Sequence, residues 1–186
     1  MTDLTNAVVH QSPVRDVKTP GLAELPTVTP AEQRNGMRHL AAGVSIISAA
    51  DSERRAGLTA TAVCSVTTDP PRLVVFVNKN VVASDIVLNS GALCVNVLAA
   101  DQQDVAQLFA NRNISMPDRL ARIATHLLAT GSPALDGALV SFDCRIVQTQ
   151  EVGTHSVFFC SVENARQNDD AVGLVYFNRA FHAVGS

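Results

Sequence analysis

The sequence predicts a mainly β protein with short helices, folded as a closed antiparallel barrel. From Val44 onward the chain consists largely of short apolar runs rich in β-branched residues and separated by turn residues, about seven runs in all. Few of the segments between them are long enough for the helical crossovers that parallel strands require. The 186 residues, of which 47% are hydrophobic, suffice to bury the core of one domain.

The first expected element is a helix that begins after Thr29. The Thr29 side chain can cap the free amides while Glu32 reaches back, and Pro30 stands where a missing N–H costs nothing. An apolar stripe at helical spacing follows, formed by Met37, Leu40, Ala41 and Val44. We therefore expect a core-packing helix that ends near Gly43.

The strands follow in order. We expect them at residues 44–47, 58–66, 73–77, 93–98, 139–148, 155–162 and 174–177. The charged segment 51–56 predicts a hairpin turn, and the Asp69-Pro70-Pro71 sequence predicts an extended corner. Short helices are expected to start near Ser84 and near Asp101, and a further helix is expected over 118–128.

Composition narrows the function classes. The formal net charge is -3 and there is no long basic run, which argues against nucleic acid and against an anionic membrane surface as partners. No apolar run approaches the roughly 20 residues that cross a bilayer. Residues 1–28 are rich in Pro, Thr and charge without the apolar segment of a secretory signal, so we expect a flexible arm before a domain at 29–186, and a cytoplasmic protein.

Cysteine and histidine spacing indicates no locally assembled metal site and leaves open a site assembled from residues distant in the sequence. The four cysteines are far apart in apolar runs, which favours buried free thiols, with disulfides as the alternative. The five histidines form no helical pair on one face. Glycine spacings typical of Rossmann or P-loop nucleotide sites do not occur either.

The most informative segment is 57–66, Gly-Leu-Thr-Ala-Thr-Ala-Val-Cys-Ser-Val. It has strand character, yet small residues occupy most places where a core strand carries bulk. A flat ligand could lie close to this backbone and meet hydroxyls and amide N–H groups. The alternative is an amphipathic strand whose threonines face water.

An ordered set of short motifs resembles the short-chain flavin reductase family. The set is the segment 57–66 followed by Asp69-Pro70-Pro71, then Phe76-Val77-Asn78, Cys94-Val95-Asn96-Val97-Leu98, Gly153-Thr154-His155 and Leu174-Val175-Tyr176-Phe177. The resemblance covers roughly residues 32–184 and is closest to the reductase components of two-component hydroxylases of the 4-hydroxyphenylacetate and chlorophenol types.

This resemblance implies a split β-barrel with Greek-key order and a homodimer with its flavin sites near the subunit interface. It implies NADH as the reductant, FAD or FMN as the acceptor, and direct hydride transfer from nicotinamide to flavin. The reduced flavin would diffuse to a separate aromatic monooxygenase. A non-catalytic flavin carrier or sensor of the same fold is the alternative function, and haem or pyridoxamine-phosphate oxidase relatives are a more distant one.

The resemblance also assigns residues by position. Thr59, Ala60, Thr61 and Ala62 would lie along the isoalloxazine ring with Ser65 and Val66 nearby, and Asn78, Lys79 and Ser84 would hold the ribityl and phosphate part. Phe109 would touch the outer part of the flavin, and Tyr176, Phe181 and His182 would face the nicotinamide side. His155 is the expected catalytic residue. Leu108 departs from the family, in which an arginine is common at that position.

Each of these residues also has a purely structural interpretation. His155 could satisfy a turn carbonyl, Asn78 could form a turn, and Lys79 could be a solvated charge. Ser84 could be a helix cap without a ligand, and the aromatic side chains could belong to the core.

Overall fold

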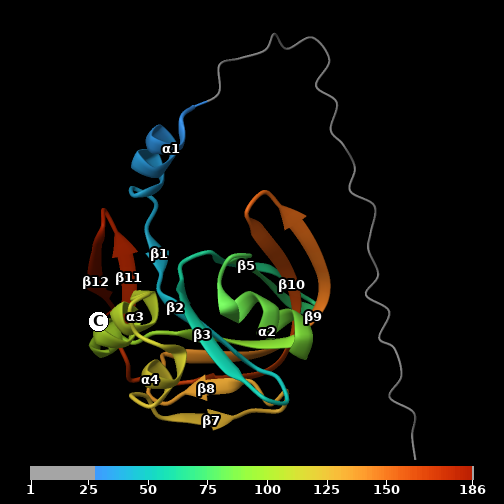
Figure 1. The fold of residues 1–186 in the computed structure, drawn as a ribbon. Helices are drawn as coiled ribbons and strands as arrows, with labels where there is room; N and C mark the ends of the chain where they lie inside the picture. Colours follow the sequence, from blue (N-terminus) through green and yellow to red (C-terminus); the bar gives the residue numbers. More distant parts are fainter. Residues whose placement is uncertain (1–27, 186) are drawn as a thin grey trace, which may run out of the picture.

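A computed structural model describes residues 28–185, which form three antiparallel sheets with short helices around them (Figure 1). The seven-stranded sheet has the order β3-β2-β6-β9-β10-β5-β4, and the smaller sheets are β1-β11-β12 and β7-β8. The strands are β1 (Ala42–Gly43), β2 (Ser45–Ala50), β3 (Arg55–Ala60), β4 (Val63–Thr68), β5 (Pro71–Asn78), β6 (Ala92–Val97), β7 (Thr125–Leu127), β8 (Pro133–Leu135), β9 (Val140–Val152), β10 (His155–Gln167), β11 (Gly173–Phe177) and β12 (Ala180–Val184). The helices are α1 (Pro30–Met37), α2 (Val82–Ser90), the 3₁₀ turn η1 (Ala100–Gln102), α3 (Gln103–Ala110) and α4 (Met116–Leu120).

The large sheet is a split barrel. Its two edge strands, β3 and β4, stand at opposite ends of the strand order, yet only Thr61 and Ala62 separate them along the chain. The sheet must therefore curl until its two edges approach each other at this link. No ladder between β3 and β4 closes the described sheet, so the expected hydrogen-bonded closure is wrong and the split barrel is confirmed.

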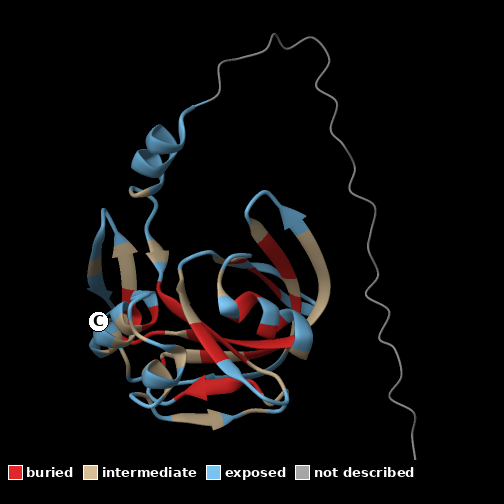
Figure 2. Cartoon of the chain, viewed as in Figure 1, coloured by how far each residue is buried: buried red, intermediate tan, exposed pale blue. Residues whose placement is uncertain are grey.

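The core fills the inside of this curl. Helix α2 lies within it (Figure 1) and buries Ile86 and Val87 against strands that supply Val75, Leu93 and Phe158. A second cluster lies beneath α3, where Ala106 and Phe109 pack against Val44, Ile46 and Leu98. Figure 2 shows the buried residues concentrated in the central strands and the inner side of α2.

The prediction for α1 is confirmed at its start and wrong over the rest of its length. The Thr29–Glu32 capping box forms with both reciprocal hydrogen bonds. The helix nevertheless ends at Met37, its residues are all solvent-exposed, and Met37 and Leu40 remain 54% and 62% exposed. Pairing of Ala42 and Gly43 with β11 draws the following residues into a strand, so tertiary pairing overrides the helical spacing.

Other boundaries also differ from expectation. The predicted strand 58–66 is interrupted at Thr61–Ala62 and forms parts of two strands, because the chain must pass from one sheet edge to the other. The predicted helix 118–128 is wrong over most of its length: α4 ends at Leu120 and β7 begins at Thr125. Among the cysteines, Cys94, Cys144 and Cys160 are free and buried as expected, whereas Cys64 is free and exposed.

No helix among residues 28–185 combines the length and apolar character needed to span a bilayer. The arm expected at residues 1–28 lies, apart from Val28, outside the described residues.

Candidate functional site

A pocket of about 570 Å³ opens where the two edges of the barrel meet. Its walls come from the end of β3, the β3–β4 link, the start of α2 and the segment that joins α3 to α4. The lining residues are Gly57, Leu58, Thr59, Ala60, Thr61, Ala62, Phe76, Asn78, Asn80, Val81, Val82, Ala83, Phe109, Ala110, Arg112, Met116, Arg119 and His155. The volume lies within the range of roughly 300–1,000 Å³ that is typical of small-molecule sites.

One wall is the predicted shelf of small residues. The structure brings together Thr59, Ala60, Thr61 and Ala62, which all line the pocket. No described strand pairs with the outer edge of β3, so part of its backbone is free to meet a ligand. The Thr59 hydroxyl, however, donates a 2.7 Å hydrogen bond to the carbonyl oxygen of Ala106 and thereby ties β3 to α3.

The start of α2 forms a second wall. Val81, Val82 and Ala83 line the pocket, and the Val82 and Ala83 amides stand in the first turn, where an α-helix supplies no acceptor. Ser84 does not open this helix as expected. It stands in the third helical position, is 2% exposed, and its amide donates to the Val81 carbonyl oxygen at 2.9 Å. The positive end of α2 faces the pocket, but through residues before Ser84.

The pocket is also lined by two arginines that were not predicted from the sequence. Arg112 is exposed at the rim, and the half-buried Arg119 comes from α4. Both lie in the segment that gave the least regular sequence pattern. The signal in the sequence was the presence of three arginines, at 112, 119 and 122, within eleven residues of an otherwise acidic chain.

His155 and Asn78 meet through strand pairing, since they are direct partners in the β5–β10 ladder and both line the pocket. The His155 ring Nδ1 lies 2.9 Å from the Thr154 hydroxyl. Lys79 does not line the pocket. Its ammonium forms a 3.0 Å ion pair with Glu151, which lies in β9 just before the β9–β10 turn.

Glu151 is held ionised at this turn. The Ser156 hydroxyl donates to its carboxylate at 2.7 Å, and this bond, followed by the contact with Lys79, lowers the pKa of Glu151 below its ordinary value. The result is a solvent-exposed ion pair next to β10, the strand that begins at His155.

An adjoining hollow of about 480 Å³ shares Thr59, Ala60, Thr61 and Ala110 with the pocket. Tyr176 and Phe181 complete it, with ring centroids 5.1 Å apart in an edge-to-face arrangement. His182 lies outside both spaces, and its Nε2 is 3.2 Å from the Phe177 carbonyl oxygen.

Ser65 and Val66 lie on β4, away from the pocket lining. Both are exposed, and Val66 interrupts the β4–β5 register. The structure therefore does not bring them together with the shelf.

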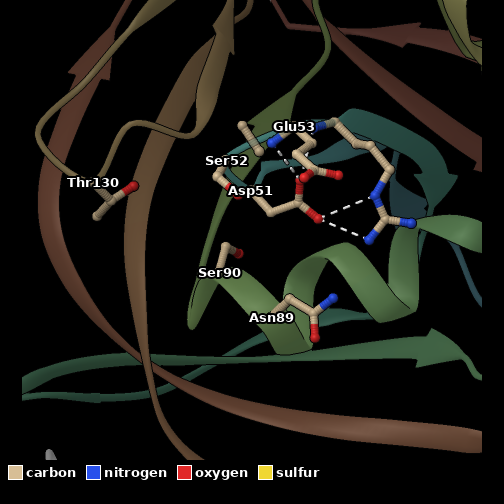
Figure 3. Close-up of a pocket in the computed structure, with 8 residues that line it drawn as sticks. Asp51, Ser52, Glu53, Asn89, Ser90 and Thr130 are labelled. Carbon is tan, nitrogen blue, oxygen red and sulfur yellow. Dashed lines mark hydrogen bonds and ion pairs between the residues drawn. The ribbon is translucent and has the colours of Figure 1, made fainter.

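A separate polar hollow of about 600 Å³ lies at the β2–β3 turn, next to the end of α2. Figure 3 shows the residues that line it. The Asp51 carboxylate there accepts from the Glu53 and Arg54 amides and pairs with the Arg54 guanidinium at 2.8 Å. The amide of Glu53 is the main reason that the pKa of Asp51 is lowered. Since Asp51 and Arg54 pair with each other within the turn and the hollow holds none of the predicted site residues, it is a poor candidate.

The family model described as "Flavin reductase like domain" matches residues 37–185. This chain belongs to the flavin reductase-like family. An FMN reductase (NADH) RutF from Ancylobacter novellus is 44% identical over 169 residues, which cover 91% of this chain and 93% of that protein.

Solved structures agree with this family. BorF, the flavin reductase component of a bacterial two-component tryptophan halogenase, superimposes with a TM-score of 0.79 and 31% identity over 85% of this chain and 99% of that chain. The NADH:FAD oxidoreductase SgcE6 of Streptomyces globisporus, in complex with NAD and FAD fragments, gives a TM-score of 0.77 and 26% identity over 88% of this chain and 98% of that chain.

The pocket of this flavin reductase-like chain has the features that a flavin requires. Small side chains at 59–62 leave room for a planar ring. The Asn78 Nδ2 and the Asn80 side-chain amide can meet polyol hydroxyls, whereas the Asn78 Oδ1 accepts from the Asn80 backbone amide at 2.9 Å. The first turn of α2 and the Arg112 guanidinium suit a phosphate. Among the described residues, no group of three potential metal-ligating His, Cys, Asp or Glu side chains is gathered.

Proposed function

We propose that this protein is an NADH-dependent flavin reductase that binds FMN or FAD in the split-barrel pocket and supplies diffusible reduced flavin to a separate oxygenase. The observation that carries the proposal is the accessible shelf 59–62 at the meeting point of the two sheet edges, with a cationic rim on one side. The names of the similar proteins, FMN reductase (NADH) and NADH:FAD oxidoreductase, support the same activity.

The residues would act by positioning. When bound, flavin supplies the chemistry of accepting a hydride from a dihydronicotinamide and passing two electrons on. Ala60 and Ala62 leave space for the ring, and free backbone amides near this edge would stabilise negative charge that develops on it. The start of α2 and Arg112 would hold the phosphate, so that the ring is fixed at its far end as well.

The adjoining hollow would receive the nicotinamide nucleotide. It shares the shelf with the flavin pocket, and Tyr176 and Phe181 give it an apolar wall for a flat ring. His155 lines the flavin pocket and not the adjoining hollow, so it would adjust the charge beside the flavin rather than contact the nicotinamide. This role does not require His155 to transfer a proton during hydride transfer.

A second copy of the chain would complete the site. Val66 and Phe76 are 49% and 37% exposed on the neighbouring strands β4 and β5, and Phe76 also lines the pocket. Covering these side chains would bury apolar surface and narrow the pocket at once. We therefore propose a homodimer, and light scattering of the purified protein measures its mass directly.

The cell compartment and the partner complete the proposal. We propose a cytoplasmic reductase that serves an oxygenase acting on an aromatic substrate. The naming of BorF as a component of a tryptophan halogenase supports a partner enzyme that uses reduced flavin.

The decisive experiment is a steady-state assay of the purified full chain that crosses FMN and FAD with NADH and NADPH. The expected result is loss of the reduced-nicotinamide absorbance in air, and bleaching of free flavin without oxygen. A preparation that retains flavin through gel filtration yet leaves NADH unchanged would contradict the proposal and indicate a flavin carrier or sensor.

A further inference from the structure

Arg119 makes an unusual set of contacts for a surface helix residue. Its guanidinium donates three hydrogen bonds, from Nε to the Ile114 carbonyl oxygen at 2.9 Å, from Nη1 to Phe109 at 3.0 Å and from Nη2 to Asn111 at 2.6 Å. All three acceptors are backbone carbonyls of the segment 109–114, which joins α3 to α4. One side chain therefore fixes the path of this whole connection.

These carbonyls need an external donor. Phe109 lies in the last turn of α3, where carbonyl oxygens lack the amide partner that a continuing helix would supply. A cation at this end of a helix is also favoured by the helix dipole. A guanidinium can reach three acceptors in one plane, whereas a lysine ammonium is a point charge without that fork geometry.

The segment that Arg119 fixes carries two groups into the proposed flavin pocket. The Phe109 side chain, 3% exposed, packs against Gly57 of β3 and lines the pocket. Arg112, the exposed cation at the rim, stands between two of the residues whose carbonyls Arg119 holds. A change in the path of the segment would move the ring and the cation together.

We propose that Arg119 is a positioning residue for flavin binding, which it promotes by holding the segment 109–114 against the shelf. This inference rests on the proposed function for the identity of the ligand. It assigns Arg119 no contact with the reacting atoms. Its effect should therefore fall on flavin affinity and on KM for flavin, with little change in kcat at saturating flavin.

The test compares Arg119→Ala and Arg119→Lys with Arg122→Ala. Arg122 lies three residues further along the chain, in the turn after α4, is exposed, and its side chain makes no hydrogen bond to the described residues, which makes it a matched control. FMN binding is measured by quenching of flavin fluorescence, which is excited and emitted in the visible, where protein side chains do not contribute. We expect the FMN Kd to rise at least tenfold in both Arg119 variants and to change less than twofold in Arg122→Ala.

Two further measurements separate positioning from a general loss of structure. Guanidinium added to Arg119→Ala, far below unfolding concentrations, should restore much of the FMN affinity, while the melting transition should remain cooperative in Arg119→Lys. An FMN Kd within twofold of the wild type in Arg119→Lys, or an affinity loss in Arg119→Ala that guanidinium leaves unchanged, would overturn the inference. Because wild-type binding is measured without NADH, an inactive wild type that still binds FMN would count against the proposed function alone.

Discussion

The Phe109 ring packs directly over Gly57, which has no side chain to separate the ring from the backbone of β3. A Cβ added at Gly57 would lie 2.7 Å from Cε1 and 3.0 Å from Cδ1 of that ring, and 3.4 Å from the Ile46 side chain. The ring and the strand line the same pocket. The absence of a side chain at residue 57 therefore sets how closely α3 approaches the shelf.

Gly57→Ala should destabilise the protein and weaken flavin binding together. A contact of 2.7 Å forces the Phe109 ring to move, and overpacking of this kind typically costs about 1–3 kcal/mol. The displaced ring would enter the pocket, so we expect KM for flavin to rise as the unfolding midpoint in urea falls.

Gly36→Ala is the matched control for that change. An added Cβ at Gly36 meets nothing within 4 Å, and the residue lies inside α1, where alanine is favoured over glycine by up to about 1 kcal/mol. The two substitutions should thus change stability in opposite directions. A Gly57→Ala protein as stable as the wild type, with unchanged KM for flavin, would show that the Phe109 ring can move aside without entering the pocket.

Thr61→Phe should block the shelf without damaging the fold. Thr61 is exposed in the link between β3 and β4, so the new side chain has no core to disturb, and stability should stay within about 0.5 kcal/mol. It would occupy the space that we assign to the ring, and we expect KM for flavin to rise at least tenfold. The equivalent change at the exposed Thr68 of β4, outside the pocket lining, should leave KM unaltered. Equal KM values for flavin in both variants would show that the shelf is not part of the flavin site.

The strand content and the shelf could be predicted from sequence because they depend on local composition. The pattern at 59–62 predicts a strand-like segment with small side chains, and the structure places these residues together in one pocket. The break at Thr61–Ala62 was not predictable, because it follows from the curl of the whole sheet rather than from either residue.

Polar residues were the hardest to interpret from sequence. Asn96 looks like a turn former, yet it is fully buried in β6. Its amide donates to the Ile46 carbonyl and the Ser48 hydroxyl and accepts from the Leu135 amide and the Ser141 hydroxyl. Those four partners come from three strands that are far apart in the sequence, β2, β8 and β9. Arg119 was missed for the same reason, since its role depends on where α3 ends.

Arg112→Gln should weaken binding of FMN more than binding of riboflavin. The two ligands differ by the phosphate that we assign to the Arg112 rim and the first turn of α2. Loss of one exposed charge-assisted contact is worth about 1.5 kcal/mol, or roughly tenfold in Kd. Fluorescence titration with each flavin measures the difference, with Arg122→Gln as the control. If both flavins lose affinity equally, Arg112 contacts the part of the ligand that they share.

Native thiol titration should modify Cys64 alone. Burial raises the pKa of both Cys94 and Cys160 to about 12, with the nearby Asp143 adding to the effect at Cys94. Burial also raises the pKa of Cys144, and neighbouring thiols and carboxylates raise it further. The thiolate is the reactive form, so these three side chains should stay unmodified by a disulfide reagent until the protein unfolds, when all four react. Cys64→Ser should abolish the native reaction, and rapid labelling of more than one thiol in the folded protein would contradict this assignment.

The same raised pKa values predict how stability depends on alkaline pH. The unfolded chain loses its thiol protons from the ordinary pKa of 9.0 upward, whereas folded Cys94 and Cys160 keep theirs up to about 12. Between these values the unfolded state binds fewer protons than the folded state, so the free energy of unfolding falls as pH rises. The contribution of these two thiols to the free energy of unfolding is fully present below the thiol pKa of the unfolded chain and is lost progressively above it. Urea unfolding at about pH 8 and about pH 10 should therefore give a lower midpoint at the higher pH, and replacing the buried Cys160 by Ala should reduce that decline even though it lowers stability at both values.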